Sequence, residues 1–102
     1  MDHGAESFSE HLNTKFSVKV DSAEPVELEL VELVVRKSEP NEQAGMERFS
    51  AFFYGPTNCF LPQQTYEVTH PAMGDFVIFL VALGKEERGF RYEAVFNRFN
   101  SD

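Results

Sequence analysis

The sequence predicts a mainly β fold: a small antiparallel six-stranded barrel or a two-layer sandwich, with a short N-terminal helix. Three observations support this. From residue 14 onward, apolar and polar side chains alternate with the period of two that is typical of half-buried strands. The segments between the alternating runs are short and rich in turn residues, as hairpin loops are. After the first dozen residues, no segment has the length and periodicity of a helix that could connect parallel strands.

The size and composition predict one domain with one core. The chain has 102 residues, of which 42 % are hydrophobic, and it contains 11 Phe. A chain of this length can bury enough apolar surface to fold without a disulfide or a structural metal. We therefore expect a single all-β domain over residues 1–102, with a short helical cap at 1–13 and a β core at 14–99.

The helical cap is predicted from one apolar helix face. Phe8, His11 and Leu12 follow the spacing i, i+3 and i+4. A helix this short is not stable alone. We expect Phe8 and Leu12 to dock it over an open end of the sheet.

The first two strands differ in their regularity. In the first, the inward residues are Phe16, Val18 and Val20. The second begins with Val26, Leu28 and Leu30, but its apolar set then continues as Val31, Leu33 and Val35. Because a slip of one residue turns every side chain to the other face, we expect a β-bulge or a bend near Leu30.

The remaining strands complete the predicted sheet. The third covers 48–54 with Phe49, Ala51 and Phe53 inward, and a short one at 65–69 has Tyr66 and Val68 inward. Residues 76–83 are apolar on both faces and predict the central strand, with Phe79 in the core. The last strand places Phe96 in the core. A polar hairpin loop is expected at 38–44.

The charge argues against polyanionic partners. The net charge is −8, with 17 acidic and 9 scattered basic residues, whereas nucleic acid and anionic membranes require clustered cations. The single cysteine, Cys59, excludes an intrachain disulfide, and the N-terminus has no signal-peptide pattern. The longest apolar run, at 76–83, is far shorter than the roughly 20 residues of a spanning helix. We expect a cytoplasmic protein that binds neither nucleic acid nor membranes.

No constellation of residues points to catalysis or a cofactor. The histidines His3, His11 and His70, taken with Cys59, lack the short fixed spacings of zinc sites, so no metal is expected. A Cys59–His70 pair is geometrically conceivable across a hairpin. However, the apolar residues after Cys59 favour an inert thiol. We expect no cofactor and no enzyme, although the sequence does not decide the latter.

One cluster of loop residues is unusual. It combines Gly55-Pro56, the segment 61–66 and His70-Pro71. In the structural interpretation, Pro and Gly fix two loops at one end of the sheet, and glutamine side chains satisfy loop backbone groups. In the functional interpretation, the same end is a recognition surface. Its candidate binding residues are Tyr54, Gln63, Gln64, Tyr66 and His70.

Several motifs carry a resemblance to a known family. They are Gly-Pro within 49–56, Leu-Pro-Gln within 60–66, His-Pro within 70–76, the run 78–81, and Ala-Val-Phe-Asn-Arg within 92–98. Over nearly its whole length, the chain resembles a family of small bacterial proteins of unknown function. The resemblance implies a structural or assembly role, because genes of such proteins often lie near those of phage-tail-collar-like proteins. It implies no catalytic residues.

Two functions are therefore carried forward. The first is a non-enzymatic protein-interaction or assembly module, with an unidentified protein partner and with self-association left open. The alternative is a small-ligand-binding barrel or minor enzyme, whose pocket at the barrel mouth is lined by Phe52, Tyr54, Tyr66 and His70. The alternative predicts an open apolar cavity of several hundred Å³ among those residues. An interaction module predicts a solid core and an exposed apolar patch.

Overall fold

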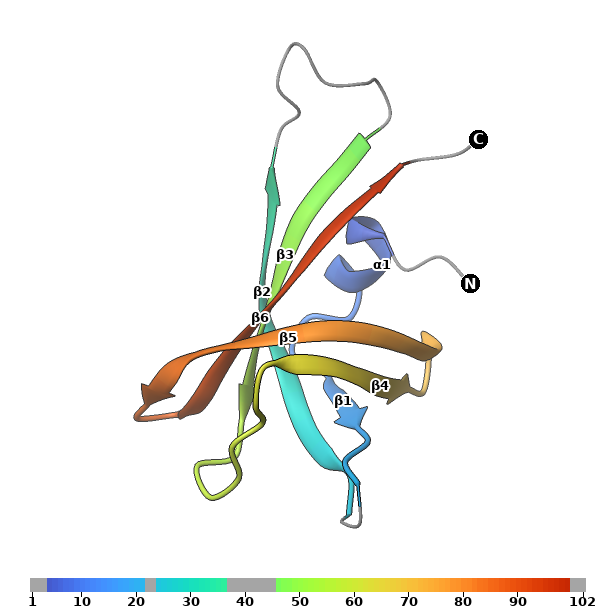
Figure 1. Ribbon diagram of the computed structural model, residues 1–102. Coiled ribbons are helices and arrows are strands. Elements are labelled where there is room, and N and C mark those ends of the chain that lie inside the picture. Colours follow the sequence, from blue (N-terminus) through green and yellow to red (C-terminus); the bar gives the residue numbers. More distant parts are fainter. Residues whose placement is uncertain (1–3, 22–23, 37–45, 100–102) are drawn as a thin grey trace.

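The computed structural model describes residues 4–21, 24–36 and 46–99 (Figure 1). Its elements are α1 (Ala5–Ser9), β1 (Lys15–Val18), β2 (Val26–Arg36), β3 (Met46–Gly55), β4 (Gln64–His70), β5 (Gly74–Glu86) and β6 (Gly89–Phe99). The strands pair antiparallel in the order β1-β2-β3-β6-β5-β4, and β1 also pairs with β4, so that the sheet closes in a ring. The predicted mainly β fold is confirmed, in its closed form. The loop predicted at 38–44 lies outside the described residues.

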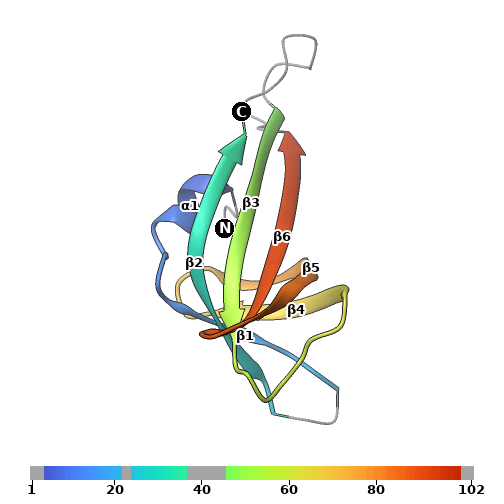
Figure 2. The same cartoon turned by 90° about the vertical axis from the view of Figure 1, so that its left-hand side faces the viewer.

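The ring is extended at one end, and only a short pairing of β1 with β4 closes it. Strands β2, β3 and β6 run past the rest of the sheet, and α1 lies against this extension (Figures 1 and 2). The short strand β1 closes the ring through two residue pairs with β4, Ser17–Thr69 and Val18–Val68. The seam between β1 and β4 is therefore the weakest part of the ladder.

The predicted irregularity in β2 is a β-bulge. Leu30 pairs with Phe53, but Glu32 pairs with Phe52, so Val31 is the extra residue on its strand. Beyond the bulge the inward apolar set does not stay buried, because Val35 is 59 % exposed. This residue lies on the part of β2 that extends past the ring, where fewer side chains can cover it.

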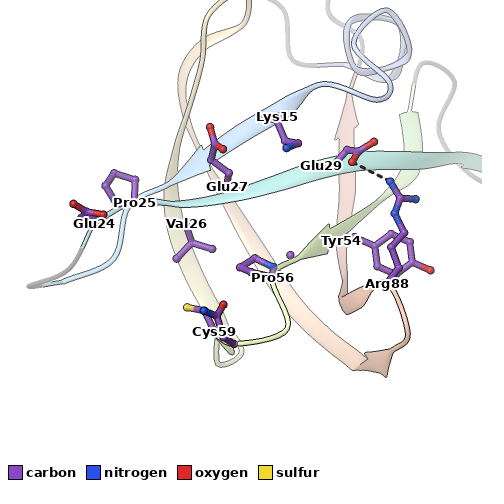
Figure 3. Close-up of a pocket in the computed structure, with 12 residues that line it drawn as sticks. Lys15, Glu24, Pro25, Val26, Glu27, Glu29, Tyr54, Pro56, Cys59 and Arg88 are labelled. Carbon is purple, nitrogen blue, oxygen red and sulfur yellow. Dashed lines mark ion pairs between the residues drawn. The ribbon is translucent and has the colours of Figure 1, made fainter.

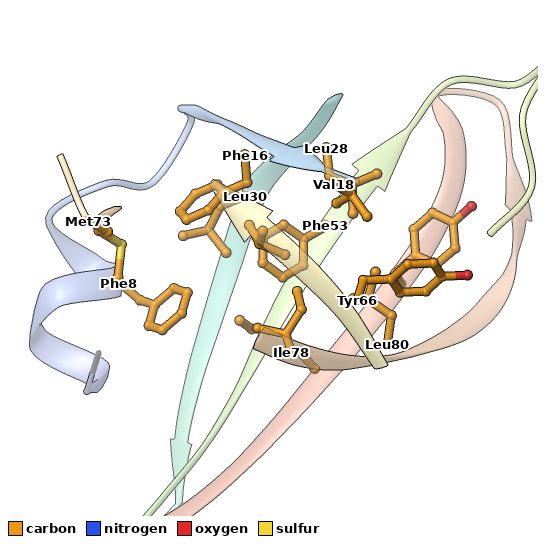
Figure 4. Close-up of a cluster of buried hydrophobic side chains, with 14 of the residues drawn as sticks. Phe8, Phe16, Val18, Leu28, Leu30, Phe53, Tyr66, Met73, Ile78 and Leu80 are labelled. Carbon is orange, nitrogen blue, oxygen red and sulfur yellow. The ribbon is translucent and has the colours of Figure 1, made fainter. Parts of the chain in front are cut away.

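Phe8 closes the extended end of the core. Its ring centroid lies 6.0 Å from that of Phe16, 5.7 Å from Phe49, 5.8 Å from Phe76 and 5.2 Å from Phe96. The side chain is fully buried and points from α1 into the cluster shown in Figure 4. The predicted docking of a short helix over the open end is confirmed.

The outer face of β5 contradicts one prediction. Ile78 and Leu80 point inward and are buried, but Phe79 is 48 % exposed. The prediction that Phe79 belongs to the core is wrong, because only the inner face of a single-layered ring lines a core. In the described chain, no second layer covers the outside of β5. Phe96, which was also predicted in the core, is only partly buried; it packs against the core and stacks on Phe49 at 4.7 Å.

Candidate functional site

The loop between β3 and β4 is anchored by two tyrosine hydroxyls. The backbone N–H of Leu61 donates a hydrogen bond to the Tyr92 hydroxyl at 3.0 Å. The Tyr66 hydroxyl donates to the Pro62 carbonyl at 2.6 Å. Burial raises the pKa of both tyrosines above the ordinary value of 10.0, so both hydroxyls remain protonated well into the alkaline range. The two hydroxyls thus form hydrogen bonds with backbone groups of the loop, a role that the sequence predicted for glutamine side chains.

An open cavity of about 660 Å³ lies on one side of this loop (Figure 3). The β1–β2 hairpin, the end of β3 and the β5–β6 hairpin surround it. Its wall is charged: Arg88 pairs with Glu29 at 2.9 Å, and the Arg88 guanidinium lies 4.8 Å from the centre of the Tyr54 ring. Lys15 and Glu27 also line it. The cavity is therefore polar, unlike the apolar pocket that a small-ligand binder requires.

Tyr54 belongs to a network that joins four strands, β2, β3, β5 and β6. Arg91 donates to the Tyr54 hydroxyl at 3.2 Å and pairs with Glu32 at 2.8 Å. The Tyr54 hydroxyl in turn donates to Glu86. The guanidinium of Arg91 also lies 4.8 Å from the centre of the Phe52 ring. This network holds the β5–β6 hairpin against β2 and β3, and it occupies the tyrosine hydroxyl as both donor and acceptor.

A groove of about 520 Å³ lies on the other side of the loop, beside β4. We call it the β4 groove; its walls include Val20, Asp21, Phe60, Gln64, Tyr66 and Val77. Phe60 is 53 % exposed although it is a large apolar residue. The groove thus combines apolar walls with charged residues at its margin.

His70 is held by hydrogen bonds on both ring nitrogens. Nδ1 accepts the backbone N–H groups of Ala72 at 3.0 Å and Met73 at 3.2 Å. Two donors at Nδ1 require that this atom carries no proton, so the proton lies on Nε2, which is 3.0 Å from Thr14 Oγ1. The Thr14 hydroxyl donates onward to the His11 carbonyl at 2.6 Å. A neutral His70 thereby joins the β4–β5 turn to the segment that follows α1.

This geometry predicts a pH-dependent contribution to stability. Burial lowers the pKa of the His70 imidazole below its usual value of 6.5, and the neighbouring His11 lowers it further. The unfolded chain therefore binds a proton at His70 more readily than the folded chain does. The stabilisation of the fold by neutral His70 is complete above pH 6.5 and is lost as the pH falls below that value. The slope from this group cannot exceed about 1.4 kcal/mol per pH unit.

The check is urea unfolding at several pH values for the wild type and for His70→Asn. The asparagine oxygen can still accept the turn N–H groups, but it does not titrate. The difference in unfolding free energy between the two proteins should shrink as the pH falls from 7 to 5. A difference that is constant over this range would contradict the lowered pKa of His70.

The five candidate binding residues do not form one site. Tyr54 lines the polar cavity, Gln64 and Tyr66 line the β4 groove, and His70 lines a third cavity of about 560 Å³. Gln63 is exposed at the bend before β4. The pocket foreseen at the barrel mouth is thus divided among separate cavities. That these five residues take part in binding stays a prediction.

Among the described residues, Cys59 lies apart from His70. Cys59 is a free, half-buried cysteine that lines the polar cavity and the β4 groove, whereas His70 lines the third cavity. The geometry therefore lends no support to a Cys–His pair. Within residues 4–21, 24–36 and 46–99, no three His, Cys, Asp or Glu side chains gather as metal ligands would.

A surface that the sequence analysis missed lies on the outside of β5 and β6. We call it the outer apolar face; it consists of Val77, Phe79, Leu83 and Val95, each at least 48 % exposed. The pairing of β5 with β6 ends at Leu80 and Ala94, and Phe79 and Val95 are the next residues of the two strands beyond that last pair. The signal was present in the sequence, because a run that is apolar on both faces must expose one of them in a single-layered ring.

Two further strands follow Val95 in register. Val95 pairs with Ser50 on β3, and Ser50 pairs with Val34 on β2. Ser50 is fully buried beneath its neighbours, and its hydroxyl has no hydrogen-bond partner among the described residues. Acidic residues flank the face, with Glu67 opposite Val77. The outer apolar face therefore spans β5 and β6, and an acidic residue borders it at Val77.

These features define a small closed antiparallel β fold with an outward apolar face. Within its described residues, no helix is long and apolar enough to cross a bilayer. The chain belongs to the family described as "Domain of unknown function (DUF6916)", which it matches over residues 3–96. No curated protein and no solved structure matches it. The predicted membership of a family of unknown function is thus confirmed.

Proposed function

We propose that this chain is a non-enzymatic protein-interaction module that binds its partner through the outer apolar face. The observation that carries the proposal is the exposure of Phe79 between two buried inward residues of the same strand, Ile78 and Leu80. Isolated surface hydrophobics are ordinary, but contiguous ones on neighbouring strands are typical of interaction sites. Burying one such Phe against a partner would contribute about 1.5–3 kcal/mol.

The charge around the face indicates the chemistry of the partner. Glu67 faces Val77 across the β4–β5 pair, and Asp75 lies two residues before Val77 on the same strand face. The chain as a whole carries a net charge of −8. A partner with an apolar centre and a basic rim is therefore favoured over a second copy, which would bring like charges together.

The family resemblance supports an assembly role for such a module. If its members act beside phage-tail-collar-like proteins, the partner would be a component of that assembly. The small-ligand alternative is less well supported, since Tyr54, Tyr66 and His70 line different cavities.

The test is affinity capture from a lysate of the source organism with the wild type and with Phe79→Ser. We expect the wild type to retain one protein in near-stoichiometric amount, with less retained at higher salt because exposed charges are screened. Phe79→Ser should reduce the amount about tenfold or more, as truncation of a central aromatic contact does. Equal retention by both proteins would refute the proposed surface.

A further inference from the structure

The seam between β1 and β4 leaves part of β4 without a neighbouring strand. Its ladder runs through Ser17–Thr69 and Val18–Val68, and the backbone N–H of Lys19 then donates to the Glu67 carbonyl at 2.9 Å. In an antiparallel strand, the N–H and C=O of every second residue point to the same side. Since the Glu67 carbonyl points toward β1, the backbone groups of Thr65 also point to that side.

The ladder does not reach Thr65. Its next partner in register would be Asp21, which already lies in the turn after β1. Among the described residues, no backbone hydrogen bond joins Asp21 to Thr65. On its other side β4 remains paired, since Thr65 lies opposite Phe79 and Gln64 opposite Leu80 on β5. Pairing with β5 thus holds Thr65 in strand conformation, while its N–H and C=O on the β1 side have no backbone partner among the described residues.

The β4 groove lies directly beside this free edge. Thr65 lines the groove together with the exposed apolar residues Phe60 and Val77. Asp21 and Glu67 also line the groove, so that it presents two carboxylates and one ammonium, that of Lys19, which lies 4.0 Å from Glu67. An extended backbone could pair with Thr65 while one side chain contacts Phe60 and a basic one reaches the carboxylates.

We propose that the free edge of β4 binds an extended, basic and apolar peptide segment of the partner by strand addition. This inference rests on the proposed function, since Val77 belongs to both the groove and the outer apolar face. Strand addition specifies an extended conformation and a positive charge for the segment of the partner that binds. A second copy is disfavoured as the occupant, because pairing two β4 edges would set Asp21 and Glu67 of one copy near those of the other.

The test uses peptides selected from a random ten-residue display library against the full chain. We expect selected peptides to alternate apolar residues with others and to be enriched in Lys and Arg. Thr65→Pro removes the free N–H without touching the ladder to β5, a place where strands accept proline. It should weaken peptide binding about tenfold, which corresponds to about 1.4 kcal/mol. Thr65→Val, which keeps the N–H, should bind as the wild type does.

A second measurement does not depend on the folding of the proline variant. Binding should slow hydrogen exchange of the Thr65 amide in the wild type, and methylation of alternate peptide nitrogens should weaken binding. Unchanged exchange, unchanged binding by Thr65→Pro, or a library that yields no binder would each overturn strand addition. Binding that is lost in Phe79→Ser but kept in Thr65→Pro would overturn strand addition and leave the proposed function standing.

Discussion

Replacing Phe8 by Ala is expected to lower the free energy of unfolding by about 3–5 kcal/mol. The side chain is fully buried and packs against the rings of Phe16, Phe49, Phe76 and Phe96. Its removal leaves a cavity that the surrounding strands can close only in part. Because α1 has five residues, it cannot persist without this docking contact.

The matched control is Phe79→Ala, which removes the same atoms from an exposed position. It should lower the unfolding free energy by less than about 1 kcal/mol. The chain contains no Trp, so urea unfolding is best followed by circular dichroism. Similar losses of unfolding free energy in the two variants would mean that Phe8 does not close the end of the core, or that Phe79 is buried.

The second large effect is expected at Gly89, in the β5–β6 hairpin. Its φ is +148°, and an added Cβ would lie 2.1 Å from the Gly55 carbonyl oxygen, which belongs to the backbone of the adjoining strand. Such an overlap can be relieved only by moving the pairing of β3 with β6. Gly89→Ala should therefore cost more than about 4 kcal/mol or prevent folding.

Gly84→Ala separates the clash from the backbone strain. Gly84 has a similar φ of +141°, but an added Cβ would meet nothing within 4 Å. We expect this variant to lose about 1–3 kcal/mol, from the strained conformation alone. Thermal unfolding of both variants checks the difference. If Gly89→Ala were no less stable than Gly84→Ala, the close approach of Gly55 to Gly89 would be refuted.

Much of the fold follows from local patterns in the sequence. Alternation located the strands, because a half-buried strand repeats its environment every second residue. The break in alternation after Leu30 located the bulge, and the spacing of Phe8 and Leu12 indicated the docked helix. Each of these signals depends on neighbours in the chain, and each can therefore be read without the tertiary structure.

The features that bear on function depend on which strands meet. Alternation assigns side chains to two faces but does not say whether the second face is covered, and so Phe79 was wrongly placed in the core. The free edge at Thr65 exists because β1 ends at Val18 while β4 continues to Gln64, a mismatch between distant segments. The candidate residues Tyr54 and His70 were grouped by their nearness to turns, but the ring separates those turns.

The central claim is that the outer apolar face binds a protein, and two valines test it most directly. Val77 lies on that face and Val35 on the extension of β2, and both are 59 % exposed. The affinity of the captured, purified partner should be measured by calorimetry for the wild type, Val77→Ser and Val35→Ser. We predict that Val77→Ser binds about tenfold more weakly, while Val35→Ser binds as the wild type does. Equal affinity of the two variants would contradict the account.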